Sequence, residues 1–132
     1  MKLAAFLATS TLLLSTASSF AQSNSVGFAE PQNGATVTSP FKVKMVVTGM
    51  KVNPAGDMAA GTGHHHLIVN GSSIKEGEVV PFNDTHLHFG KGQTETELTL
   101  APGKYTLTLQ FANDAHQSYG EPMSKRIDVV VK

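Results

Sequence analysis

The sequence predicts an all-β protein, an antiparallel β-sandwich of seven or eight strands. No stretch repeats its apolar residues with the helical period, whereas several short runs alternate apolar and polar residues. Gly, Pro, Asn and Asp separate these runs, as turn residues do between strands. Alternation places one apolar face of each strand on a core, and many short strands with regular turns are typical of two packed sheets.

Residues 1–21 have the layout of a secretory signal peptide and are excluded from the predicted fold. Lys2 precedes an apolar stretch that ends at Leu14, and Ser19 and Ala21 are the small residues that a cut after position 21 requires. The apolar stretch is too short to span a bilayer and no second one follows, so we expect no membrane anchor after cleavage. The expected destination is the periplasm or the medium.

Residues 22–132 are expected to form a single β-sandwich domain, which is long enough for one core. Ten Lys and Arg balance ten Asp and Glu, and loss of Lys2 with the signal peptide leaves one negative charge in excess. This balance gives no reason to expect nucleic acid as a partner. The chain has no Cys, which excludes disulfides, thiolate zinc sites and blue-copper centres.

The alternating runs predict the strands in order, and their pattern is that of an immunoglobulin-like or cupredoxin-like sandwich. Val26 begins an edge strand that Pro31 stops, and Asn70-Gly71 ends the strand that contains the triple histidine. The runs 94–100 and 104–111, joined by a Pro-Gly turn, are expected to form a hairpin. The predicted strands are residues 26–29, 41–47, 65–69, 86–89, 94–100, 104–111 and 126–131.

The six histidines fall at three places: 64–66, 86 with 88, and 116. Side chains two apart on a strand point to the same face. If Leu67 and Val69 face the core, His65 joins them, and His64 and His66 face the other way.

The second strand predicts the same arrangement. Leu87 and Phe89 would enter the core, which leaves His86 and His88 on the opposite face. If the two strands are neighbours, four imidazoles meet, and His116 from the connection 112–124 completes the set. The predicted metal ligands are His64, His66, His86, His88 and His116, with His65, Asp84 and Asp114 as structural or orienting residues around them.

Copper is the expected metal ion and zinc its main rival. Imidazole suits Cu(II), Zn(II) and Ni(II), whereas the thioethers of Met50, Met58 and Met123 in the connections would suit Cu(I). These methionines are more often packing residues than ligands. Binding is expected to weaken below about pH 6, as imidazoles gain protons.

Other site chemistry finds little support. There is no Gly-x-Ser-x-Gly nucleophile motif, and Gly90-Lys91-Gly92 lacks both the spacing and the following helix of a phosphate loop. This segment is most simply a tight turn. The alternative is that it also holds the histidines in place and lets Lys91 or Gln93 reach an anion.

Four segments carry a resemblance to a known family. Gly63 to Leu67, His86 to Glu95, Leu100 to Leu107 and Asp114 to His116 resemble the bacterial exported family called domain of unknown function 4399. The segments 31–35 and 39–41 fit it as well. The resemblance implies a periplasmic, β-rich single domain and no established activity. Two positions depart from the pattern: Asn70 stands where Asp is expected, and Tyr105 stands where His is common.

Three functions from different classes are compatible with these residues. The first is a non-enzymatic periplasmic copper carrier, buffer or resistance factor with an open coordination position for handover to a metal-handling protein. The second is a copper redox enzyme of the superoxide dismutase type, because His-x-His on a sandwich strand also resembles those enzymes. The third is a metal-free immunoglobulin-like module that binds a protein or glycan through exposed loops.

Overall fold

The computed structural model describes Ser18 and residues 23–132, so nearly all of the predicted signal peptide lies outside the described residues. The described chain contains nine β-strands and one short 3-10 turn, which confirms the all-β class. The strands are β1 (Ser25–Glu30), β2 (Ala35–Val37), β3 (Phe41–Thr48), β4 (Lys51–Val52), β5 (Thr62–Val69), β6 (His86–His88), β7 (Glu95–Leu98), β8 (Gly103–Ala112) and β9 (Ser124–Val131).

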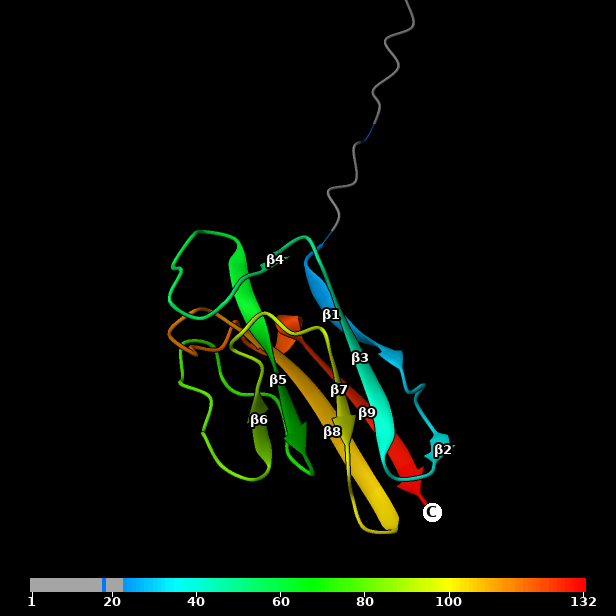
Figure 1. Cartoon of the computed structure of the whole chain (residues 1–132). Coiled ribbons are helices and arrows are strands. Elements are labelled where there is room, and N and C mark those ends of the chain that lie inside the picture. Colours follow the sequence, from blue (N-terminus) through cyan, green and yellow to red (C-terminus); the bar gives the residue numbers. More distant parts are fainter. Residues whose placement is uncertain (1–17, 19–22) are drawn as a thin grey trace, which may run out of the picture.

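The strands form two sheets that face each other as a sandwich (Figure 1). One sheet has the order β1-β3-β7, and the other has the order β2-β9-β8-β5-β4, with β6 also paired to β5. Most pairs are antiparallel, as expected, but β2 with β9 and β4 with β5 are parallel. The two extra strands are only two and three residues long, too short for any alternation to reveal them.

The core lies between the two sheets and follows the predicted alternation. In β3, Phe41, Val43 and Met45 are buried and the residues between them are not. In β8, Leu107 and Leu109 are fully buried and face this layer from the opposite sheet. Removing such apolar surface from water is the main free-energy gain of folding.

The predicted hairpin between residues 94–100 and 104–111 is wrong. β7 pairs with β3, with Phe41 opposite Leu98, whereas β8 pairs with β5 and β9 in the other sheet. The Pro-Gly connection therefore crosses from one sheet to the other. Alternation shows which side of a strand faces the core, but it does not identify the strand that pairs with it.

The outer face of β5 and β8 is buried as well. Ile68 and Gln110 are fully buried there, and Thr108 is nearly so. The loops 70–85 and 113–120 cover this face on the side where β6 lies (Figure 1), and a bridge between Val79 and Gln117 joins the two loops. Polar side chains that alternation places opposite the core are therefore enclosed, and the histidines of β5 are among them.

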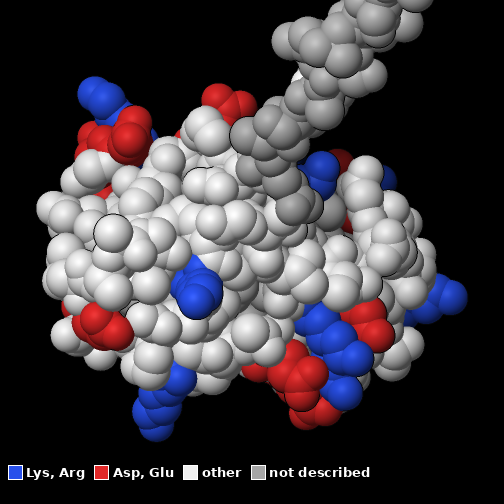
Figure 2. Space-filling model, turned by 90° about the horizontal axis from the view of Figure 1, so that it is seen from above, with Lys and Arg blue, Asp and Glu red and all other residues white. Residues whose placement is uncertain are grey.

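Charged groups are scattered over the surface. On the face shown in Figure 2, Lys, Arg, Asp and Glu are mixed among uncharged residues, so this face has no extended basic area of the kind that binds nucleic acid. In the part of the chain that is described, no helix has the length and apolarity needed to cross a bilayer.

Candidate metal centre

Three segments bring four histidines together under the covering loops. β5 carries His64 and His66 on its outer face, and β6 pairs with β5 so that His88 lies directly opposite His66. His116 comes from the loop that follows β8, whose last residue, Ala112, lies opposite His64. The prediction that the two His-x-His strands are neighbours is confirmed.

The four rings point one nitrogen each at a common point. The Nδ1 atom of His116 lies 3.0 Å from Nε2 of His64, 3.3 Å from Nε2 of His66 and 3.2 Å from Nδ1 of His88. One ligand atom from each of the four residues lies within 4.8 Å of all the others. Imidazole nitrogens bind zinc at about 2.0–2.1 Å, so nitrogens on one ion lie about 3–4 Å apart. The cluster can therefore hold a single ion.

Hydrogen bonds on the far side of two rings orient them. Nδ1 of His66 lies 3.3 Å from the carbonyl oxygen of Gln110, and Nε2 of His88 lies 2.6 Å from that of Pro81. Because a carbonyl only accepts, each of these ring nitrogens must carry the proton and donate it. In a neutral imidazole the other nitrogen then has a free lone pair, and in both rings this nitrogen faces the cluster.

His116 is fixed by an unusual backbone conformation. Its φ of 61° lies in the left-handed region, which few residues other than Gly adopt. Its N–H donates to the carbonyl of Asn113 and its carbonyl accepts from the N–H of Val80, both at 2.9 Å. Backbone and side-chain hydrogen bonds between Asn113 and Gln117 close the same turn. The loop therefore holds the fourth ring in place, and the strained φ lies at the proposed site.

Burial and repulsion between neighbouring rings lower the pKa values of three of these histidines, His64, His66 and His116. Burial, followed by the charges of His116 and His88, lowers the pKa of His64 to about 4. The negative charge of Asp114 offsets a smaller part of this shift. Burial and the three neighbouring rings lower the pKa of His66 to about 2. Burial also lowers the pKa of His116. A neutral imidazole is the form that binds a metal ion, so the fold prepares these ligands.

His86 does not join the cluster, although the sequence placed it among the candidate ligands. Its Nδ1 atom lies 2.9 Å from Oδ1 of Asn83 and 3.0 Å from Oγ1 of Thr85. It stands opposite Ile68, two residues further along the strand pair than His88, and two residues on a strand span about 6.6 Å. Asp84 is exposed in the turn before β6 and is not part of the cluster either.

His65 and Asp114 surround the site in different ways. His65 belongs to the core set, as predicted: it is fully buried and its ring packs edge-to-face on Phe111, with centroids 5.2 Å apart. Asp114 accepts a hydrogen bond from the backbone N–H of Gly56, which ties the loop before β5 to the loop of His116. Burial lowers the pKa of His64 and of His116, and the charge of Asp114 offsets part of that lowering, so Asp114 acts on the rings through its electric field.

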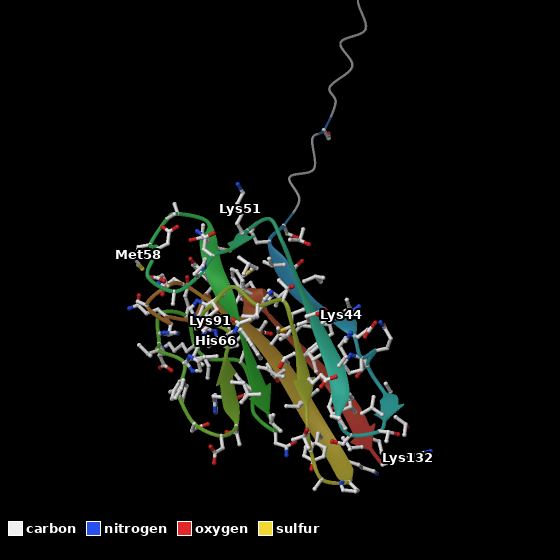
Figure 3. The ribbon with its side chains drawn as sticks, in the orientation of Figure 1. Lys44, Lys51, Met58, His66, Lys91 and Lys132 are labelled. Carbon is white, nitrogen blue, oxygen red and sulfur yellow. The ribbon has the colours of Figure 1, made fainter. Side chains whose placement is uncertain are left out.

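The methionines give no direct support for Cu(I). Met123 is buried in the core, and Met50 packs against it. Met58 is 64% exposed, and Figure 3 places it on the outer loop before β5, apart from His66. Across residues 23–132 the cluster is therefore built from imidazoles alone.

Gln110 is the supporting residue that sequence reasoning missed. Its backbone carbonyl accepts from His66, and its side-chain NH2 group donates to the carbonyls of Gly120 and Met123. Its Oε1 atom accepts from the N–H of Ile74, so one buried amide holds both covering segments. The sequence does place Gln110 on the polar face of its strand. Its position beside His66 follows only once β8 is known to pair with β5.

Tyr105 lies far from the cluster along β8. It stands near the strand's first residue, Gly103, and its hydroxyl donates to the carbonyl of Ala101, whereas the cluster lies beyond the other end at Ala112. A histidine at position 105 would therefore not reach these four rings, and the four-histidine cluster forms without it.

The comparisons with known proteins identify a family and no function. No curated protein and no solved structure matches the chain significantly. The family described as Domain of unknown function (DUF4399) matches residues 43–132, which include all six histidines. The match covers more than half of the chain, and it agrees with the resemblance of the histidine segments. The chain therefore belongs to the DUF4399 family.

Proposed function

We propose that this protein is a periplasmic copper-binding protein that carries, buffers or sequesters the ion, with His64, His66, His88 and His116 as its ligands. The observation that carries the proposal is the convergence of four imidazole nitrogens within 4.8 Å of one another. Two of these rings are fully buried and two are half-buried, and a cation between nitrogens this close together would bind all four rings at once.

Copper is preferred to zinc on the nature of the ligands. The cluster offers nitrogen only, and among divalent first-row ions a given nitrogen site binds Cu(II) most tightly. Zinc in structural sites is more often held by sets that include thiolates, which this chain lacks. Zinc remains the alternative ion, because imidazole suits both.

A competition titration tests the metal and the ligands together. Mature protein, purified without a metal-affinity step, is titrated with Cu(II) and Zn(II) by calorimetry. We expect one ion per chain, and we expect Cu(II) to displace Zn(II). Zinc binding in preference to copper would overturn the choice of metal, and no binding of either ion would overturn the site.

Storage or transport is preferred to catalysis because the convergence of four imidazoles accounts for holding an ion and requires no further reaction. A copper redox enzyme is the second candidate, since His88 and His116 are only partly buried and solvent can approach them. A dismutase assay on copper-loaded protein separates the two. A metal-free interaction module is the third, and metal analysis of the protein isolated from cells tests it.

The location and partner follow from the same proposal. Residues 1–21 would direct the chain out of the cytoplasm, and a periplasmic metal-handling protein would supply or accept the ion. Fractionation of cells that express the full chain tests the first point. Recovery of processed protein from the periplasmic or secreted fraction supports it, and recovery only from the cytoplasm contradicts it.

A further inference from the structure

A hollow of about 410 Å³ opens beside the metal centre. Two of the four cluster histidines, His88 and His116, line it, whereas His64 and His66 are fully buried behind them. An ion in the cluster would therefore be approached from this side. The hollow is also lined by Val79, Val80, Phe82, Gly90, Lys91 and Gln93.

The charges around this approach favour an anion. Imidazole ligands carry no negative charge and would leave the double positive charge of a divalent ion unneutralised, whereas the carboxylate of Asp114, which acts on His64 and His116, would offset only part of it. Lys91 adds a further positive charge to the wall of the hollow, and Figure 3 shows it in the same part of the molecule as His66. Positive charge at a cleft attracts and concentrates small anions.

We propose that the hollow binds a small monovalent anion, which coordinates the metal ion with one end and meets the ammonium group of Lys91 with the other. The proposal rests on the proposed function, because the ion is one of its two contacts. If the four imidazoles hold Cu(II), a further ligand could reach the ion from the hollow that His88 and His116 line. The anion would therefore add to the imidazoles without displacing them.

The other walls of the hollow limit the size and chemistry of the ligand. The ring of Phe82 meets that of His88 edge-to-face, with centroids 4.8 Å apart, and Val79 provides a second apolar wall. Oε1 of Gln93 accepts from the backbone N–H of Lys91 at 2.9 Å, which leaves its NH2 group as the end that can donate to a ligand. Apolar walls with a few polar groups are typical of a small-ligand site.

Azide binding to copper-loaded protein tests the proposal. Copper loading is measured first, and azide is then added while the azide-to-copper charge-transfer absorption and the electron paramagnetic resonance spectrum are recorded. We expect saturable binding of one azide per copper. Lys91→Gln should weaken azide binding up to about fivefold, which is the upper end of the range for an exposed charge pair.

Lys51→Gln is the matched control, because it removes the same charge from an exposed lysine of β4 that lines a different hollow. It should change azide affinity by less than about twofold. Two results would overturn the anion site without contradicting the metal site. One is copper-loaded protein that shows no azide absorption band, and the other is equal azide affinity in the Lys91→Gln and Lys51→Gln variants. Failure to load copper would instead overturn the proposed function.

Discussion

His66 and His88 lie directly opposite each other in the antiparallel pair of β5 and β6, and their rings meet edge-to-face with centroids 4.4 Å apart. Each ring also lies beside His116, at centroid distances of 5.6 Å and 4.9 Å. The register of one strand pair thus places two of the four cluster histidines beside each other, and a loop adds a third. A shift of one residue would turn one ring to the other face, so the proposed metal binding depends on this register.

His88→Ala tests the ligand set, and His86→Ala is its control on the same short strand. Loss of a residue that only orients a ligand costs 10–100-fold in metal affinity, so loss of His88 itself should lower Cu(II) affinity at least about a hundredfold. His86 bonds to Asn83 instead, and its loss should change affinity less than about threefold. Calorimetric titration measures the Cu(II) affinity of both variants. Equal losses of affinity would show that the choice of His88 over His86 as a ligand is wrong.

The pH dependence of copper binding follows from the lowered pKa values. A histidine in an unfolded chain gains its proton near pH 6.5, but the pKa of His64 is lowered to about 4 and that of His66 to about 2. Protons therefore compete with copper at these two rings only at lower pH than they would at free imidazoles. Copper affinity should therefore fall more slowly between pH 7 and 5 than it would for four free imidazoles, and more steeply toward pH 4. Titrations at four pH values measure this, and a loss between pH 7 and 5 as large as that of four free imidazoles would contradict it.

His65→Leu is expected to leave the protein as stable as the wild type at pH 7, or to stabilise it by about 1 kcal/mol. Both ring nitrogens of His65 are buried with no hydrogen-bond partner among the described residues, and an unpaired buried polar atom costs about 1–3 kcal/mol. Leu keeps a similar volume and has no such atoms. Urea unfolding of the metal-free protein measures the change. A loss of more than about 2 kcal/mol would mean that the histidine makes a favourable contact.

Gly63→Ala tests the close approach of β5 to β8 beside His64. An added Cβ would meet the carbonyl oxygen of Ala112 at 2.2 Å, so the two strands would have to separate. Overpacking of this kind typically costs about 1–3 kcal/mol, and Cu(II) affinity should fall as His64 moves. Gly27→Ala is the control, since its Cβ would only touch Val46 at 3.7 Å. Unfolding and copper titration of both variants measure the effect, and equal behaviour would contradict it.

The sequence predicted the class of the fold and most of the cluster from strand periodicity alone. Spacing by two placed His64 and His66 on one face and His65 on the other, and the structure agrees because β5 is a regular strand. The same rule could not exclude His86, because it gives the face of a side chain and not its distance from a neighbour. The hydrogen bond between His86 and Asn83 forms within a turn, and strand periodicity does not describe turns.

The rest depended on contacts between segments that are distant in the chain. Two consecutive alternating strands read as a hairpin, but β7 and β8 pair in different sheets. Alternation places Gln110 on the face of β8 opposite the core, and it is buried there because the loops 70–85 and 113–120 cover that face. The carbonyl of Pro81 that orients His88 also comes from one of these loops. Loop placement follows from tertiary packing, which a local pattern does not encode.

The most direct test of the central claim is a crystal structure of copper-loaded protein with anomalous diffraction recorded at the copper edge. We expect one strong anomalous peak, from a single copper ion, at about 2 Å from Nε2 of His64 and His66 and from Nδ1 of His88 and His116. A peak bound elsewhere, or an ion held by only one or two of these rings, would contradict it.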